Sequence, residues 1–168
     1  MFNVPLKNMD DIKKFIFGGR ATFTLRSKKT MTRFTFRMQR PEDHDIDSDF
    51  RFVQVLTGPD NESNFSYLGT WGKYGYRHGK KSTINPESPS SLAIEWFARC
   101  VEAEYLPHNL EVWHEGRCAA CNRKLTVPKS LKRGFGPDCA QRFGVTCEDL
   151  TPEEEMEYRA RRQEWGDA

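Results

Sequence analysis

The chain has 168 residues, of which 37% are hydrophobic and 30% are charged, and its formal net charge is +2. Twelve Phe, five Tyr and four Trp exclude a disordered chain, because disordered chains are poor in aromatic residues. No apolar run reaches the length of about 18 residues that a membrane span needs, and residues 1–17 lack the apolar centre of a signal peptide. We therefore expect a folded protein of the cytoplasm with no membrane partner.

Charge is distributed unevenly along the chain. Residues 1–40 carry ten basic side chains against two acids, and residues 116–145 carry seven against one. Residues 41–49 hold five acids and no Lys or Arg. The sequence therefore predicts separate basic and acidic surfaces on a nearly neutral protein.

The first two-thirds of the chain predict a short helix and several strands. Residues 10–17 form the expected helix, with two acids at its positive end. Apolar and polar side chains alternate over 21–25, 31–38, 50–56 and 65–71, as in half-buried strands. Residues 72–89 are rich in Gly, Lys and Ser and predict a loop.

The last third predicts two further helices around a short strand. One helix begins at Ser90 or Ser91 and continues to about Glu104, and residues 110–113 form a strand. The final helix begins at Thr151, with Pro152 in its first position and Glu154 completing a capping box. We expect an α+β fold: an antiparallel β-meander with a few helices over 1–108, a zinc-knuckle module over 109–150 and a terminal helix over 151–168.

Three of the five cysteines, Cys118, Cys121 and Cys139, have the spacing of a metal site. A Cys-x2-Cys turn directs two sulfur atoms at one point, and Zn²⁺ takes four such ligands in a tetrahedron. Gly134, Gly136 and Pro137 permit a turn and a helix start that would place Cys139 in the first helical turn. The sequence predicts one structural Zn²⁺ ion, whereas Cys100 lies on the apolar side of a helix and is expected in the core.

The fourth ligand has two candidates. His114 precedes the Cys-x2-Cys turn by four residues and would be delivered by the strand that ends at Trp113. Cys147 follows Cys139 by eight residues and is the alternative. The position three residues after Cys139, where a helical partner would lie, is Arg142, which leaves these two. We favour His114, because the strand could deliver it to the site.

The cysteine segment carries three motif elements within residues 118–140: Cys118-x2-Cys121, Leu125-Thr126-x-Pro128-x-Ser130 and Gly134-x-Gly136-Pro137-x-Cys139-Ala140. In these elements it resembles a family of phage and bacterial zinc-finger-like domains. That family has no assigned activity to carry over. The resemblance implies a phage-type accessory protein, acting in the host cytoplasm, and implies nothing catalytic.

Binding to nucleic acid is the function that the residues favour. Basic side chains surround the cysteines, and a second group with tyrosines lies in the predicted loop, so that phosphates could be neutralised while rings stack on bases. The two groups are Arg117, Arg123, Lys124, Lys129, Lys132 and Arg133, and Lys73, Tyr74, Tyr76, Arg77, Lys80 and Lys81. Arg33 and Arg37 share one face of a strand and could extend this surface.

Two other functions stay open. The acidic segment 41–49 and the acids of the terminal helix suit a protein that binds and modulates a host or phage enzyme, for example an inhibitor of a defence system of the anti-CRISPR type. A zinc-dependent enzyme is the third possibility, because an exchangeable ligand would let the metal activate water. The sequence offers no catalytic set and no phosphate-binding loop, so we expect neither catalysis nor a small-molecule substrate.

Overall fold

The computed structural model describes residues 4–42, 50–60 and 63–164, and within these it has the expected α+β fold. The strands form one antiparallel sheet in the order β1-β7-β2-β3-β4-β5-β6. Their bounds are β1 Val4–Leu6, β2 Arg20–Ser27, β3 Arg33–Gln39, β4 Arg51–Leu56, β5 Phe65–Gly72, β6 Gly75–His78 and β7 Leu110–His114. The helices are α1 Met9–Ile16, α2 Pro89–Glu102, α3 Pro128–Arg133, α4 Pro137–Arg142 and α5 Pro152–Glu164.

The alternation of apolar and polar residues in the strands divides the sheet into a buried and a polar face. Phe23 pairs with Phe36 across β2 and β3, and both are fully buried. On the other face, Thr22 pairs with Arg37 and Arg26 pairs with Arg33. Because successive side chains of a strand point to opposite faces, the apolar side chains lie on one face and the polar ones on the other, as the sequence predicted for these strands.

Helices α1 and α2 both cover the buried face. Phe97 of α2 packs against Phe23 and Trp71, with ring centroids 5.8 and 6.1 Å apart. Phe15 of α1 stacks at 5.0 Å on His114, which is paired with Phe23 across β7 and β2. The polar face, which we call the open face, is thus the side of the sheet away from these helices.

Two predictions about where strands and helices begin were wrong in detail. The segment 72–89 is not all loop, since β6 pairs with β5 and forms the edge of the sheet. Helix α2 begins after Ser88, whose hydroxyl accepts a hydrogen bond from the Ser91 amide, rather than after Ser90 or Ser91. Strand β6 has four residues, too few for periodicity to show in a sequence, and three serines at 88, 90 and 91 each offer a hydroxyl that could cap α2.

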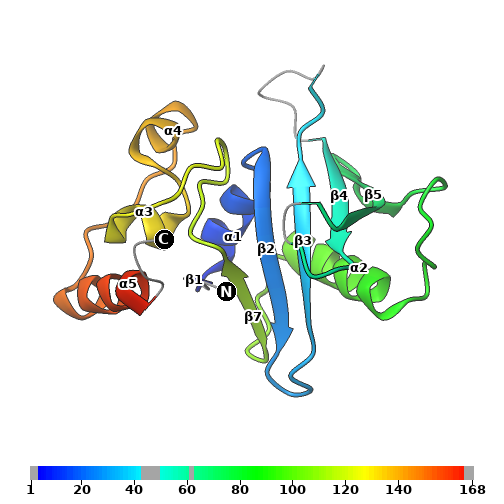
Figure 1. Ribbon diagram of the computed structural model, residues 1–168, viewed down its shortest axis with the longest axis horizontal. Helices are drawn as coiled ribbons and strands as arrows, with labels where there is room; N and C mark the ends of the chain where they lie inside the picture. The colour runs from blue at the N-terminus through cyan, green and yellow to red at the C-terminus, as the bar shows by residue number, and fades with distance from the viewer. Residues whose placement is uncertain (1–3, 43–49, 61–62, 165–168) are drawn as a thin grey trace.

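The C-terminal third is joined to the sheet through β7. This strand lies between β1 and β2, so the expected domain boundary at 108/109 falls immediately before a strand inside the sheet. Figure 1 shows α3, α4 and α5 beside β7, on the side of the sheet opposite to β4, β5 and α2. The cysteine segment therefore continues directly from β7, a strand inside the sheet.

Among the described helices, none combines the length and the apolar character required to cross a bilayer. Most of the acidic segment, residues 43–49, lies outside the described residues.

Candidate metal centre

The Cys-x2-Cys turn is built by a short hairpin after β7. Arg117 and Lys124 form an isolated antiparallel bridge, and the Cys118 amide donates to the Arg123 carbonyl at 2.8 Å. Asn122 closes the turn with a positive φ of 64°, a conformation that Asn tolerates better than most residues. The hairpin brings Cys118 and Cys121 to the same side.

The third cysteine comes from the start of α4. Helix α3 ends at Gly134, which has a φ of 77°, and a side chain there would collide with the ring of Phe15. Pro137 then begins α4, so Cys139 lies in its first turn, as the sequence predicted.

The three cysteines form a compact donor set. Their Sγ atoms all lie within 4.8 Å of one another. Three sulfur atoms at the Zn–S distance of about 2.3 Å on a tetrahedral ion would be about 3.8 Å apart, so the spacing fits one ion. Cys118 is fully buried, whereas Cys121 and Cys139 are half-buried.

The protein environment prepares one of the thiols for ionisation. Burial acts to raise the pKa of Cys118, but backbone amides of Gly136, Cys121 and Ala120 donate to its sulfur and bring the pKa below its ordinary value. The Gly136 nitrogen lies 3.5 Å from that sulfur. Amide donors of this kind stabilise a thiolate and a metal bound to it.

Ionisation of Cys139 is opposed by its surroundings. Burial, with the neighbouring thiols Cys121 and Cys118, raises the pKa of Cys139 to about 12. Three thiolates this close repel one another unless a cation lies between them, and a divalent metal removes that penalty. The donor set therefore suits a thiolate-binding metal such as Zn²⁺.

His114, the expected fourth ligand, is placed elsewhere. It is fully buried, its Nδ1 accepts from the Gly116 amide at 3.0 Å, and its Nε2 donates to the Leu131 carbonyl at 2.8 Å. Burial lowers its pKa to about 4, so the ring is neutral. With both nitrogens engaged, His114 holds β7 to α3 and has no lone pair left for a metal.

Cys147, the alternative, also lies outside the donor set. Its sulfur donates to the carbonyl of Glu148 at 3.3 Å, and burial raises its pKa. The described residues therefore supply three sulfur ligands to the site, and neither candidate for the fourth position joins them.

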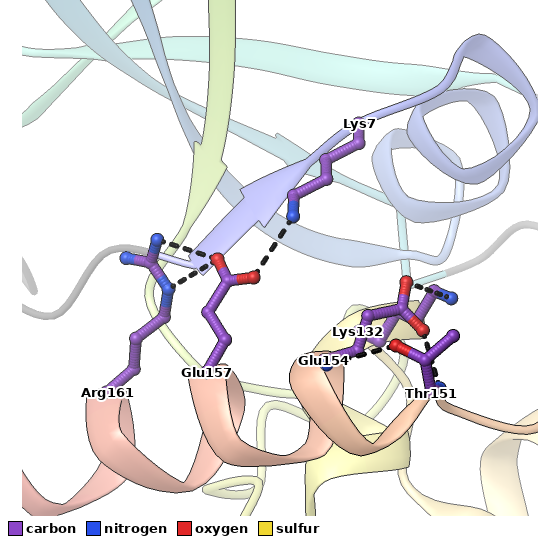
Figure 2. Close-up of polar contacts among 6 residues, drawn as sticks. All are labelled: Lys7, Lys132, Thr151, Glu154, Glu157 and Arg161. Carbon is purple, nitrogen blue, oxygen red and sulfur yellow. Dashed lines mark hydrogen bonds and ion pairs between the residues drawn. The ribbon is translucent and has the colours of Figure 1, made fainter.

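Three of the basic residues expected around the cysteines are held by other parts of the chain. Lys132 Nζ lies 2.9 Å from a carboxylate oxygen of Glu154. Glu154 also accepts from the Thr151 amide in the predicted capping box (Figure 2). Lys129 pairs with Asp149 at 3.1 Å, and Arg133 donates to the Phe135 carbonyl. Of these three contacts, the pair of Lys132 with Glu154 joins the module to α5, whereas Asp149 precedes that helix and the Arg133 bond stays within the module.

The remaining expected residues divide among three places. Arg123 and Lys124 line a cavity with the cysteines, and Arg117 lies beside a second cavity on the open face. The group from 73 to 81 lies in the β5–β6 hairpin and the residues that follow it. Tyr76 is half-buried, and the Lys73 ammonium lies 5.8 Å from the centre of the Tyr74 ring. The exposed members include Tyr74, Arg77, Lys80 and Lys81. Since β6 is five strands from β7, the hairpin is roughly 24 Å from the cysteine segment, and the two groups do not form one patch.

Two further features were not predicted. Arg20 and Thr22 line the cavity beside Arg117, together with Arg37, Gln39, Glu115 and Asn122. The alternation in 20–27 is the sequence signal that could have placed Arg20 with Arg37. Ser130 is 1% exposed and lines the cysteine cavity, a position that no local pattern reveals.

Residues 110–144 match the sequence model of a family of unknown function, DUF6011. This segment contains β7, the hairpin and all three clustered cysteines. Comparison with curated proteins and with solved structures gave no match.

Proposed function

We propose that the protein is a zinc-stabilised nucleic-acid-binding protein and that the open face of its sheet is the binding surface. The observation that carries this proposal is the cavity of about 390 Å³ at the end of that face. Arg20, Arg37 and Arg117 line it together with one acid, Glu115. Three arginines that line one polar cavity are suited to a phosphate, because a guanidinium group carries several donors in a planar fork that matches phosphate oxygens.

Arg37 is held in place at the floor of this cavity. Its Nε donates to the Gln54 side chain at 2.9 Å, and its guanidinium carbon lies 4.0 Å from the centre of the Phe65 ring. Burial lowers the pKa of Arg37, and Glu115 opposes that effect, so the group keeps its charge. A fixed guanidinium loses little conformational freedom when a phosphate binds.

Aromatic side chains continue the surface from the arginines across the sheet. Phe52, Gln54 and Leu56 alternate onto the open face of β4, opposite Thr70, Tyr67 and Phe65 of β5. Phe52 is 40% exposed. Rings on a basic sheet can stack on unpaired bases, so this arrangement favours single-stranded over double-stranded nucleic acid.

The metal has a structural role in this proposal. Arg117 directly precedes Cys118, and its guanidinium donates to the Asn122 carbonyl across the cysteine hairpin. A Zn²⁺ ion on the three cysteines would fix this hairpin and thereby the position of Arg117 in the cavity.

The test is binding of the zinc-loaded protein to short single- and double-stranded nucleic acids across a salt series. We expect Arg37→Gln and Arg117→Gln to weaken binding and each to reduce the salt slope for a single strand by about 0.7, the loss of one phosphate contact. Arg99→Gln is the matched control, because Arg99 is an exposed residue of α2 on the other side of the sheet. Unchanged binding in both cavity variants, or weakening equal to that of Arg99→Gln, would contradict the proposal.

A protein-binding modulator is the second candidate, and one observation favours it. A largely apolar cavity of about 270 Å³ lies between α2 and the β2–β3 turn with the start of β3, lined by Phe34, Ala93, Trp96 and Leu110 among others. Trp96 is 39% exposed and its neighbour Leu92 is 52% exposed. Loss of a captured phage or host protein in Trp96→Ala, with nucleic-acid binding absent in the wild type, would support this alternative.

A further inference from the structure

The three clustered cysteines form one wall of a cavity that reaches the protein surface. Its volume is about 430 Å³, and Ser130 lines it together with the cysteines. The rim includes Arg123, Thr126 and Asp138, which are exposed. A space of this size is larger than a single coordinated ion requires.

We infer that the fourth coordination position of the metal faces this cavity and holds an exchangeable small ligand, with the Ser130 hydroxyl as its hydrogen-bond partner. This inference rests on the metal site proposed above. The fourth position of the metal would then be accessible from solvent: water would occupy it, and a small ligand with a nitrogen or sulfur donor could replace that water.

The first support is the count of protein donors. Zn²⁺ in proteins is almost always four-coordinate in closed structural sites, and a site with three protein ligands completes its shell with water or another small ligand. Within the described residues, three sulfur atoms lie close enough to share one ion. His114 and Cys147 are engaged elsewhere, and Asp138, although it lines the cavity, is not among the clustered donors.

The second support is an unsatisfied hydroxyl in the same cavity. Ser130 is 1% exposed, and its Oγ has no hydrogen-bond partner among the described residues. Buried hydroxyl groups are rarely left unpaired, so a partner from outside the chain is indicated. A ligand on the metal, in the cavity that Ser130 lines, would supply that partner.

The charges around the cavity favour entry of a ligand. Three thiolates on a divalent ion carry a net charge of −1, and Arg123, Lys124 and Arg142 lie around the cavity against Asp138. The cations offset the negative centre, so that neutral donors and small anions can approach it. The geometry therefore suits a small, single-donor ligand such as an imidazole or a thiol.

Cobalt provides the test, because Co²⁺ occupies the same class of sulfur site and its visible spectrum reports its ligands. The protein is loaded with Co²⁺ and titrated with imidazole. We expect a saturable change in the visible bands at constant metal content. Ser130→Ala should lower the imidazole midpoint by a factor of about 5, since the displaced water has lost one hydrogen bond. Thr83→Ala removes an exposed hydroxyl from the segment between β6 and α2, away from this cavity, and should leave the midpoint unchanged.

The outcomes separate this inference from the metal site itself. Co²⁺ binding without any response of the wild-type protein to imidazole would show a closed shell and overturn the exchangeable position alone. A spectral change in Asp138→Asn would then identify the protein donor. Failure of the protein to bind Co²⁺ or Zn²⁺ would overturn both the inference and the proposed metal site.

Discussion

The sheet and the cysteine module reach a fixed structure by different means. The sheet has a continuous apolar interior in which Phe23, Phe36, Phe97 and Trp71 are buried between its strands and α2. The module contains two helices of six residues each, too short to be stable on their own. It buries Leu131 and Phe135 in the same core, and it is also held by the thiol cluster, by His114 and by contacts with α5.

This difference separates stability from function. Hydrophobic burial keeps the sheet folded whether or not a metal is present. The module shares that core through Leu131 and Phe135, and a metal on its three cysteines would add binding energy to its stability. Arg117 lies in the module but lines a cavity with Arg20 and Arg37 of the sheet. A change in the metal site is therefore expected to affect binding on the open face without unfolding the sheet.

Cys121→Ser should have the largest effect and should separate the two regions most clearly. Removing one of three sulfur ligands should abolish stoichiometric zinc binding and lower the stability of the zinc-loaded module by at least about 5 kcal/mol, since metal-binding energy is also folding energy. Hydrogen exchange should accelerate over 116–145 and stay slow in β3 and β4. Cys147→Ser is the matched control, and we expect it to keep its zinc; protection of 116–145 in Cys121→Ser would contradict this division.

Phe97→Ala should give the opposite pattern. Phe97 is fully buried and packs between Phe23 and Trp71, so its loss leaves a cavity in the main core. We expect a loss of about 4 kcal/mol in the free energy of unfolding, measured by denaturant titration. Zinc content should be unchanged at temperatures below the transition, and a parallel loss of zinc would show that the module has no order of its own.

The His114 contact should make the junction between the two regions sensitive to pH. Its folded-state pKa of about 4 lies below the ordinary value of 6.5, because burial disfavours the charged ring. Between these two pH values the unfolded chain binds more protons than the folded protein. The contribution of neutral His114 to the free energy of unfolding is therefore complete above pH 7 and is lost as the pH falls from 6.5 to 4. The full effect is about 3 kcal/mol.

His114→Asn provides the comparison for that prediction. The Asn side chain can still accept from the Gly116 amide but does not titrate. The difference in melting temperature between wild type and variant should therefore shrink from pH 7.5 to pH 5, while acid-induced loss of metal affects both. A constant difference over this range would show that His114 is not the titrating group.

The regular parts of the fold were predictable because periodicity and capping are local. Strands β2 to β5, the start of α4 at Pro137 and the capping box of Thr151 and Glu154 follow from residues close in sequence. Strands β1 and β6 are three and four residues long, too short to show a period.

The metal site was predictable only in part for a related reason. Cysteine spacing indicated the donors, but nothing in the sequence shows that the Leu131 carbonyl and the Gly116 amide take both nitrogens of His114. The pairing of Lys132 with Glu154 likewise joins residues 22 apart, so its loss from the basic surface needed the tertiary structure.

Thr151→Ala should have the smallest effect of the set and tests how α5 contributes to the module. The Thr151 hydroxyl accepts from the Glu154 amide, and Glu154 in turn is held against Lys132 of α3, as Figure 2 shows. Loss of this N-cap should cost about 1 kcal/mol. The cost should appear as faster hydrogen exchange in α3 and the first turn of α5, because the cap positions the carboxylate that pairs with Lys132.

Thr30→Ala removes an exposed hydroxyl in the β2–β3 turn, at the opposite end of the chain from α5, and should leave both helices unchanged. Exchange that quickens in α5 but not in α3 would mean that the ion pair survives without the cap, and that α5 stabilises the module through the buried ring of Tyr158 instead.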